Sequence, residues 1–305
     1  VLCLVLTFFA LSRIKPQLKG GIYSYASAGF GDFLGFNSAW GYWISALLCT
    51  VSFSALLFGA LSYFFPIFGE GNNLASIVGA SCLIWFYVFL VSRGIKEVTG
   101  VNAVITISKV VPIFVAITAI IFLQKFDLGI FMANLATGAD PNLPFWEQVS
   151  GTMMVTIWVF IGIEGAAVMS SRARNKHEVG KATVIGLICL LLIYIGCSVL
   201  PYGYMSYTEI AQLDYPAMLY VFDSMAPGWG GAFISIAIIV GVAGAWLSFT
   251  MLPAETTSEM AERHLLPESW GKLNSKGAPQ MSLLLVGACI QVFLIVLMFS
   301  EDAYN

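Results

Sequence analysis

A single carboxylate stands in a long apolar stretch of the sequence. In residues 149–171 the only charged side chain is Glu164, and Gly162 and Gly165 flank it. An acidic side chain at the centre of a membrane-spanning helix costs about 2.5–3.5 kcal/mol on insertion scales, so such residues usually face a protein interior or a water-filled cavity. Because removal from water favours the neutral carboxyl group, Glu164 is a candidate for reversible protonation.

The two glycines favour an interruption of the helix around Glu164. Each glycine lowers helix propensity by about 1 kcal/mol relative to alanine. A helix that breaks here exposes main-chain carbonyls on one side and N–H groups on the other, and many transporters build their substrate and ion sites in this way. The alternative is a structural Glu164 that accepts hydrogen bonds from main-chain N–H groups and never titrates.

Aromatic side chains accompany the carboxylate in the apolar segments. Trp158 precedes it by six residues, Trp246 lies in a span rich in small residues, and Tyr42 and Trp43 precede several hydroxyl residues. A tryptophan face can hold a desolvated cation by about 2 kcal/mol. Packing in the core or at the lipid interface is the alternative for any one of these aromatics, but together they favour a cavity.

Enzyme motifs are missing from the sequence. The two histidines, His177 and His264, lie in polar loops beside other charged residues, and no HExxH, P-loop or GxSxG motif occurs. The six cysteines form no CxxC pair and fall in apolar blocks, where they are typical of packing residues. We therefore expect no catalytic residue, metal ion, cofactor or nucleic-acid partner.

The elements that must position these residues are transmembrane helices. Hydrophobic residues make up 59% of the 305 residues and charged residues only 10%, whereas soluble domains carry about 25% charged residues. The composition therefore predicts an all-α polytopic membrane protein. A span needs about 20 mostly apolar residues, and residues 1–11 are the end of one such helix. We predict seven complete spans at 36–65, 75–92, 101–124, 149–171, 182–206, 230–254 and 279–299.

The basic residues predict the orientation of these spans. Twelve of the 14 lysines and arginines fall in alternate loops. Because cytoplasmic loops carry an excess of basic residues, these loops are predicted to be cytoplasmic. They are the loops at 12–35, 93–100, 172–181 and 255–278. On the opposite side, the mixed segment 205–229 is expected to form a short surface helix or lid.

Several stretches resemble a known transporter family. GGIYSYASAGFGDFLGF (20–36), IWVFIGIEGAAVMSSRAR (157–174) and the span around Trp246 resemble the amino acid–polyamine–organocation superfamily, and its basic amino acid/polyamine antiporters in particular. LPYGY (200–204) and LPAETTSEM (252–260) resemble more narrowly the bacterial arginine/ornithine antiporters and their lysine-transporting relatives. The resemblance covers nearly the whole chain.

The resemblance implies a fold. The family fold has twelve helices with a five-plus-five inverted repeat, like that of the leucine transporter. Aligned to it, residues 1–305 form one transmembrane domain that is incomplete at both ends. The chain runs from the end of the second family helix to the ninth, without the first and tenth helices.

The resemblance also implies a binding site. Trp158 matches the tryptophan that stacks on the substrate side chain. The main-chain carbonyls of Trp158 and Ile161, at the break around Gly162, are expected to bind the substrate amino group. Where relatives that bind arginine can carry asparagine, this chain has Thr50, which offers a hydroxyl instead of an amide. The third family helix is expected to contribute Ser45, Ala46, Thr50 and Phe53.

Four residues are expected to act in gating. By the same resemblance, Glu164 matches a glutamate implicated in gating and pH sensing. Trp246 matches a middle-gate tryptophan, Tyr42 an outward-gate tyrosine and Tyr23 an inner-gate tyrosine.

The function implied is secondary amino acid transport by alternating access. Exchange of cationic amino acids, such as arginine for ornithine, is the expected activity. A proton-coupled permease for lysine or a neutral amino acid is the alternative of the same class, and a seven-helix receptor or channel subunit is the alternative of another class. We expect amino acid substrates, a lipid bilayer in the bacterial cytoplasmic membrane, and a homodimer as one allowed assembly.

Overall fold

A computed structural model describes most of the chain. The described residues are 2–15, 18, 22–94, 118, 126–137, 144–160, 162–163, 165, 176–213 and 216–299. They form helices joined by turns, with one isolated bridge between Leu273 and Pro279.

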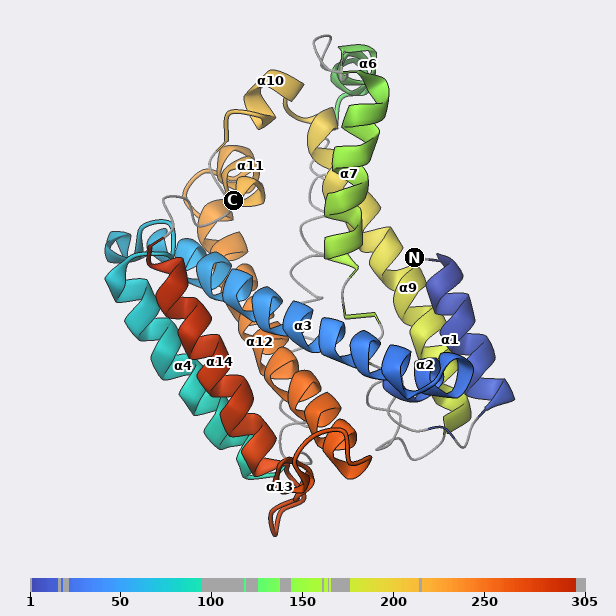
Figure 1. Cartoon of the computed structure of the whole chain (residues 1–305). Coiled ribbons are helices and arrows are strands. Elements are labelled where there is room, and N and C mark those ends of the chain that lie inside the picture. Colours follow the sequence, from blue (N-terminus) through green and yellow to red (C-terminus); the bar gives the residue numbers. More distant parts are fainter. Residues whose placement is uncertain are drawn as a thin grey trace. The chain divides into compact units, whose positions relative to one another are not determined.

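The chain divides into two compact units, each of which contains segments that are far apart in the sequence (Figure 1). Unit 1 comprises Val1–Gln17 and Ile113–Gly231, and unit 2 comprises Leu18–Pro112 and Ala232–Asn305. Unit 1 contains α1 (Leu2–Ile14), α6 (Leu128–Thr137), α7 (Phe145–Val159), α9 (Lys176–Val199), η3 (Leu200–Gly203), α10 (Tyr207–Ile210) and α11 (Ala217–Met225). Unit 2 contains α2 (Ile22–Phe30), α3 (Asp32–Ser62), η1 (Pro66–Phe68), α4 (Leu74–Ser92), α13 (Glu268–Gly271), α14 (Gln280–Leu297) and nearly all of α12 (Gly230–Glu262).

Helices α4 and α14 of unit 2 lie side by side and are joined by polar contacts (Figure 1). The Trp85 indole N–H donates to Gln291 Oε1 at 3.2 Å, and Gln291 Nε2 donates to Ser81 Oγ at 2.8 Å. A Cβ added to Gly287 would lie 2.9 Å from Val88 Cγ2, so the two helices approach closely at this glycine. Small residues and interhelical hydrogen bonds are typical of helix pairs in membranes, where no hydrophobic effect drives association.

Helices α2 and α3 form a tight hairpin. Gly31 turns the chain between them with φ +88°, a conformation that favours glycine. A Cβ on Gly35 would lie only 2.8 Å from Ser27 Cβ, so these helices also pack closely. The hairpin places α2 beside the start of the long helix α3.

In unit 1, α1 packs against α9. Val5 and Leu187 form a buried cluster with Ile163, and Gly180 lets α9 approach the Ser12 hydroxyl. The α6 helix is fixed to the corner after α9, where the Asp127 N–H donates to Gly203 O at 2.7 Å. The ends of α9 are thus held by α1 and α6.

Five described helices are long and apolar enough to cross a membrane. They are Asp32–Ser62, Leu74–Ser92, Gly180–Gly203, Gly230–Glu262 and Gln280–Leu297. They match five of the seven predicted spans, and α1 matches the predicted end of an eighth helix. The predicted span at 101–124 lies outside the described residues except for Thr118, and the one at 149–171 is described only in part.

Two boundaries differ from the sequence predictions. The predicted cytoplasmic loop at 255–278 begins too early, because α12 continues through Pro253 to Glu262. In this extension the buried Thr257 hydroxyl is satisfied, because Oγ1 donates to Pro253 O at 2.8 Å, and the apolar Met260 is fully buried. The predicted loop at 12–35 also contains a helix, α2, whose buried residues are Tyr23 and Ser24.

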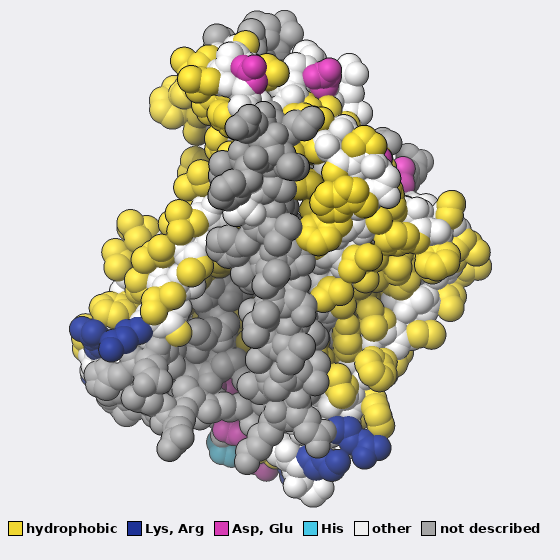
Figure 2. Space-filling model, turned by 180° about the vertical axis from the view of Figure 1, so that it is seen from behind, with side chains coloured by type: hydrophobic (Ala, Val, Ile, Leu, Met, Phe, Trp, Pro, Cys, Tyr) yellow, Lys and Arg dark blue, Asp and Glu magenta, His cyan; other side chains and the backbone are white. Residues whose placement is uncertain are grey.

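Basic side chains lie at one end of each unit. In unit 2, Arg93 follows α4, and the neighbouring Gly94 approaches Lys276 in the segment before α14. In unit 1, Arg13 ends α1 at the point where α9 begins. Figure 2 shows the Lys and Arg side chains gathered in separate groups, and hydrophobic side chains over much of the rest of the described surface in that view. This polarity is the one expected of membrane helices with basic cytoplasmic ends.

Candidate functional site

Helix α7 ends close to the predicted interruption. Its last helical residue is Val159, and the Phe160 N–H still donates to Thr156 O at 3.3 Å. Gly162 then adopts φ +108°, which a residue with a Cβ rarely adopts. The chain therefore leaves the helix shortly before the first of the two glycines that flank Glu164.

Some of the predicted site lies outside the described residues. The main chain of Trp158 belongs to the last turn of α7, but its side chain is not described. Ile161 and Glu164 are not described either. Their expected roles in amine binding, stacking and protonation remain predictions.

Tyr194 of α9 holds the end of α7. Its hydroxyl donates to Val159 O at 3.1 Å, and its ring meets Phe160 edge-on with centroids 5.2 Å apart. The last carbonyls of a helix have no partner within the helix, so this bond satisfies one of them. Sequence reasoning did not identify Tyr194, although a tyrosine inside a strongly apolar helix is a signal for such a bond.

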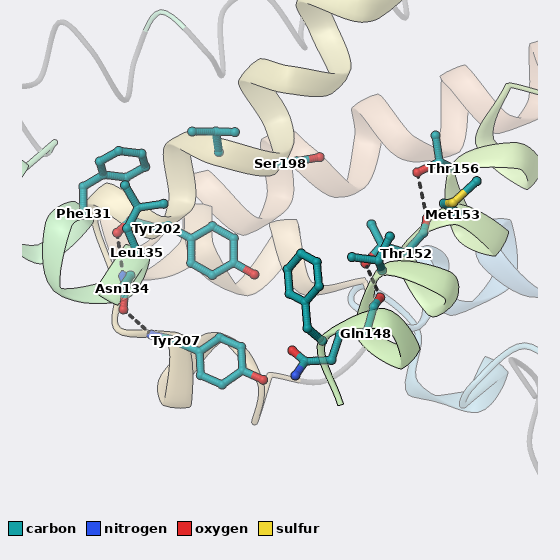
Figure 3. Close-up of a pocket in the computed structure, with 13 residues that line it drawn as sticks. Phe131, Asn134, Leu135, Gln148, Thr152, Met153, Thr156, Ser198, Tyr202 and Tyr207 are labelled. Atoms are coloured by element: carbon teal, nitrogen blue, oxygen red, sulfur yellow. Dashed lines mark hydrogen bonds between the residues drawn. The ribbon is translucent and has the colours of Figure 1, made fainter. Parts of the chain in front are cut away.

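A cavity of about 790 Å³ borders α7 on the N-terminal side of the interruption (Figure 3). Its described lining residues carry no charge, and Thr156 is the lining residue of α7 nearest to the helix end. Figure 3 shows Tyr202, Tyr207 and Gln148 around the same space. The lining residues are Phe131, Asn134, Leu135, Phe145, Gln148, Val149, Thr152, Met153, Thr156, Ser198, Val199, Tyr202 and Tyr207.

Asn134 of α6 organises one wall of this cavity. Its Nδ2 donates to Tyr202 O at 2.6 Å and to Met205 O at 2.9 Å, and its Oδ1 accepts from Tyr207 N at 2.8 Å. Asn134 is only 8% exposed, so these bonds satisfy a buried amide. The sequence analysis did not single out Asn134, and the LPYGY stretch drew attention only through its family resemblance.

The predicted residues of the third family helix lie along α3 in unit 2. Ala46 and Thr50 are fully buried, and Ser45 is exposed. The Thr50 hydroxyl donates to Ala46 O at 2.8 Å, and Ser45 Oγ donates to Gly41 O at 2.9 Å. Each hydroxyl proton is therefore already used within the helix, and each oxygen keeps its capacity to accept.

The expected gate residues of unit 2 are buried. Trp246 of α12 is 0% exposed, and its ring lies 6.1 Å from that of Tyr87, whose hydroxyl donates to Ala243 O at 2.9 Å. The Trp246 indole N–H has no hydrogen-bond partner among the described residues. Tyr42 of α3 is also buried. Unit 2 further brings Phe53 of α3 edge-on to Phe249 of α12, with ring centroids 5.3 Å apart.

Tyr23, the expected inner-gate residue, lies between α3 and α12. It is 3% exposed and packs with Ala39 of α3 and Met260 of α12. Its hydroxyl donates to Asp32 Oδ1 at 3.2 Å. Tyr23 thus packs near the C-terminal end of α12, whereas Trp246 lies in the middle of α12.

The chemistry of the described residues gives no metal site. Among them, no group of three or more His, Cys, Asp or Glu side chains is close enough to hold a metal ion. The described features are instead a helix end with a held carbonyl, buried aromatic side chains and an uncharged cavity.

The chain is similar to bacterial antiporters along its whole length. The amino acid permease family model matches residues 1–305. An arginine/ornithine antiporter of Latilactobacillus sakei is 45% identical over 100% of this chain and 64% of the relative, and one of Pseudomonas aeruginosa is 46% identical over 99% and 62%. An arginine/agmatine antiporter of Chlamydia pneumoniae is 39% identical over 98% of this chain and 62% of the relative.

The chain therefore spans a little under two thirds of the length of these relatives. The match of the family model to the full chain agrees with the five apolar helices that are long enough to cross a membrane. The chain belongs to the amino acid permease family.

Proposed function

We propose that the protein that contains this chain exchanges arginine for ornithine across the bacterial cytoplasmic membrane by alternating access. The observation that carries the proposal is identity of 45–46% with two arginine/ornithine antiporters over 99–100% of the chain. Such identity over almost the whole chain makes a shared substrate class the simplest expectation. The apolar spans supply the membrane setting that exchange requires.

In this proposal, the end of α7 binds the amino group of the substrate. Main-chain carbonyls at Trp158 and Ile161 accept from the ammonium, and the turn at Gly162 exposes them. The Trp158 ring stacks on the substrate side chain, where a cation gains from the ring face. The hydrogen bond from Tyr194 to Val159 O supports the proposal, because it fixes the helix end through a carbonyl other than those of Trp158 and Ile161.

Thr50, Ser45, Ala46 and Phe53 on α3 complete the proposed site. A guanidinium or ammonium group carries donors and no acceptor, so its partner must accept. The Thr50 oxygen can accept because its own proton is directed to Ala46 O. A hydroxyl can therefore serve a cationic substrate where relatives carry an amide.

Glu164, Trp246, Tyr42 and Tyr23 are the proposed gating residues. Trp246 and Tyr42 close the outer path, Tyr23 closes the inner path, and Glu164 couples protonation to the gate. We expect Glu164→Gln to remove the pH dependence of exchange while arginine binding is largely kept. An unchanged pH profile of the initial exchange rate, measured in liposomes, would make Glu164 a structural residue.

The remaining features of the proposal concern the whole protein. We infer a five-plus-five inverted repeat, an inner-membrane location and homodimers as an allowed assembly. The uncharged cavity beside α7 is proposed to lie on the outer approach to the site. Its position is consistent with this role. Helix α10 lies in the segment 205–229, which is predicted on the outer side, and α6 lies between the predicted spans 101–124 and 149–171 on the same side.

Counterflow of labelled substrates in liposomes tests the exchange reaction. Liposomes that contain the full-length protein are loaded with unlabelled ornithine, and uptake of labelled arginine, ornithine, lysine, agmatine and a neutral amino acid is compared. We expect arginine and ornithine to give the fastest uptake, and empty liposomes to give none. Uptake into empty liposomes would favour the proton-coupled permease.

The relative named as an arginine/agmatine antiporter supports one second candidate. Agmatine lacks the carboxylate of arginine, so an agmatine exchanger must tolerate its absence. Faster counterflow with agmatine than with ornithine would favour this second candidate.

A further inference from the structure

A polar cluster joins α2 to the end of α12 in unit 2. Arg263 Nη2 donates to Ser24 Oγ at 2.6 Å and to Glu259 Oε1 at 3.3 Å. Ser24 Oγ in turn donates to Glu259 Oε1 at 3.1 Å. Ser24 is 1% exposed, whereas the Arg263 side chain is 39% exposed. A buried hydroxyl is thus held between a carboxylate and a guanidinium that reaches it from the surface.

The same arginine covers Tyr23. The Arg263 guanidinium carbon lies 4.9 Å from the centroid of the Tyr23 ring. Beneath it, Tyr23 packs with Ala39 of α3 and with Met260 of α12, which is 0% exposed. Separation of α2 from α12 would therefore expose both Tyr23 and Met260.

The contacts of α2 with α3 are of a different kind. Ser27 Oγ donates to Asp32 Oδ1 at 2.5 Å, and Gly35 packs directly on Ser27. These contacts lie within a hairpin closed by the turn at Gly31, so α2 is expected to move together with the start of α3. The joint with α12 instead depends on charge-assisted bonds from Arg263, whose side chain is partly exposed to water, and such bonds can be made and broken.

We propose that Arg263, Glu259 and Ser24 form a latch that positions α2 and Tyr23 against α12, and that opening of this latch is a step of the transport cycle. The proposal rests on the proposed function, because the step belongs to alternating access. Arg263 acts here as a positioning residue, since it holds the expected inner-gate tyrosine and contacts no substrate. The latch therefore governs the rate of the conformational step and leaves substrate affinity unchanged.

Chemical modification of a buried position tests the latch directly. Met260→Cys is introduced into the full-length protein, and its reaction with a membrane-permeable maleimide is followed by mass spectrometry of the peptide that contains it. We expect Arg263→Ala to increase the modification rate about tenfold and Ser24→Ala about threefold, because each removes a contact that keeps α2 docked. The double variant should react about as fast as Arg263→Ala alone, since the two residues share one interaction.

Arg93 provides a matched control at the same end of unit 2. Its guanidinium carbon lies 4.8 Å from the ring centroid of Phe89, as Arg263 lies over Tyr23, but it borders α4 instead of α2. Arg93→Ala should leave the modification rate of Met260→Cys unchanged. An equal increase in this control, or no increase in both Arg263→Ala and Ser24→Ala, would overturn the latch.

Transport measurements separate the latch from the proposed function. With the natural Met260 retained, Ser24→Ala and Arg263→Ala should lower the maximal exchange rate about threefold, because the docked state must form again in each cycle. Equilibrium arginine binding should change by less than about twofold, and Arg263→Lys should restore part of the rate. A loss of affinity in proportion to the rate would contradict the latch. If the unsubstituted protein exchanges no arginine, the proposed function fails, while the modification rates still decide whether the joint opens.

Discussion

Helices α3 and α7 are both expected to contact the substrate, yet they are built in opposite ways. Helix α3 runs without interruption for 31 residues, and its buried residues extend from Gly35 to Ala60. Helix α7 has 15 residues and ends at Val159, shortly before Gly162 turns the chain with a positive φ. One helix is fixed by side-chain packing along its length, and the other is fixed at its end by a hydrogen bond from Tyr194.

This difference assigns different chemical groups to the two helices. In a continuous helix the main-chain groups are paired, so α3 has only side chains to offer to a substrate. An interrupted helix leaves carbonyls without helical partners, so α7 can offer its main chain. Substitutions in the buried face of α3 and at the end of α7 therefore test the two arrangements separately.

The largest effect is expected from the buried packing of α3. Trp43 is 5% exposed and stacks on Trp40, with ring centroids 4.9 Å apart. We expect Trp43→Ala to lower the free energy of unfolding by about 3–5 kcal/mol, because it leaves a large cavity. Thermal unfolding of the full-length protein in detergent measures this loss.

Trp40 is the matched control for this prediction. It belongs to the same stacked pair, but Trp40 itself is 39% exposed. Trp40→Ala should therefore cost much less than Trp43→Ala. Similar losses for the two variants would show that α3 is not fixed by packing on its buried face.

At the end of α7 we expect a smaller loss of stability than in the packing of α3, and a larger loss of arginine binding. Gly162→Ala forces a side chain into a conformation with φ +108°, which costs about 1–3 kcal/mol. We expect the variant to shift the turn and to weaken arginine binding, measured by isothermal titration calorimetry.

Gly41 on α3 gives the opposite expectation. Nothing lies within 4 Å of a Cβ added at this helical position. Gly41→Ala should therefore increase the free energy of unfolding by about 0.5–1 kcal/mol and leave arginine binding unchanged. If Gly162→Ala behaved like Gly41→Ala, the turn at the end of α7 would have no special role.

Removal of one hydroxyl tests how the end of α7 is held. Tyr194→Phe deletes the hydrogen bond to Val159 O but retains the ring that contacts Phe160. We expect a loss of about 1 kcal/mol in the free energy of unfolding, because the carbonyl is left without this partner. Arginine affinity should fall as well, and a variant with wild-type stability and affinity would contradict the holding role.

The smallest effect is expected at a surface cap outside both helices. The Ser206 hydroxyl and N–H donate to Glu209 Oε2 at 2.7 Å and 2.9 Å, and these bonds hold the pKa of the Glu209 carboxyl below its ordinary value. The stabilisation is therefore complete above the ordinary pKa of glutamate and is lost as the pH falls through the lowered pKa. Hydrogen exchange of α10, corrected for its intrinsic rate, should be faster in Glu209→Gln at neutral pH. The difference from wild type should disappear in acid, and a difference that persisted there would exclude the carboxylate as its cause.

Much of the fold follows from the apolar pattern of the sequence. Helices α3, α4, α9, α12 and α14 appear where long apolar runs predict spans, because a helix in lipid must satisfy its own main-chain groups. The end of α7 shortly before Gly162 is also consistent with local sequence, since Gly162 adopts a positive φ that other residues avoid.

Other features depend on contacts that a local pattern does not contain. The extension of α12 to Glu262 was missed because its charged residues resemble a loop, and its stability comes from tertiary burial of Met260. Helix α2 is short, and its position depends on Arg263 from a segment more than 200 residues away. Tyr194 and Asn134 also act through distant main-chain carbonyls, so their roles emerge only from the fold.

Simultaneous measurement of arginine entry and ornithine exit tests the central proposal most directly. Liposomes containing the full-length protein are loaded with ornithine that carries one isotope, and arginine that carries another isotope is added outside. Obligate exchange predicts equal initial rates of arginine entry and ornithine exit, and no exit when external arginine is omitted. Arginine entry without ornithine exit would contradict exchange as the function of this protein.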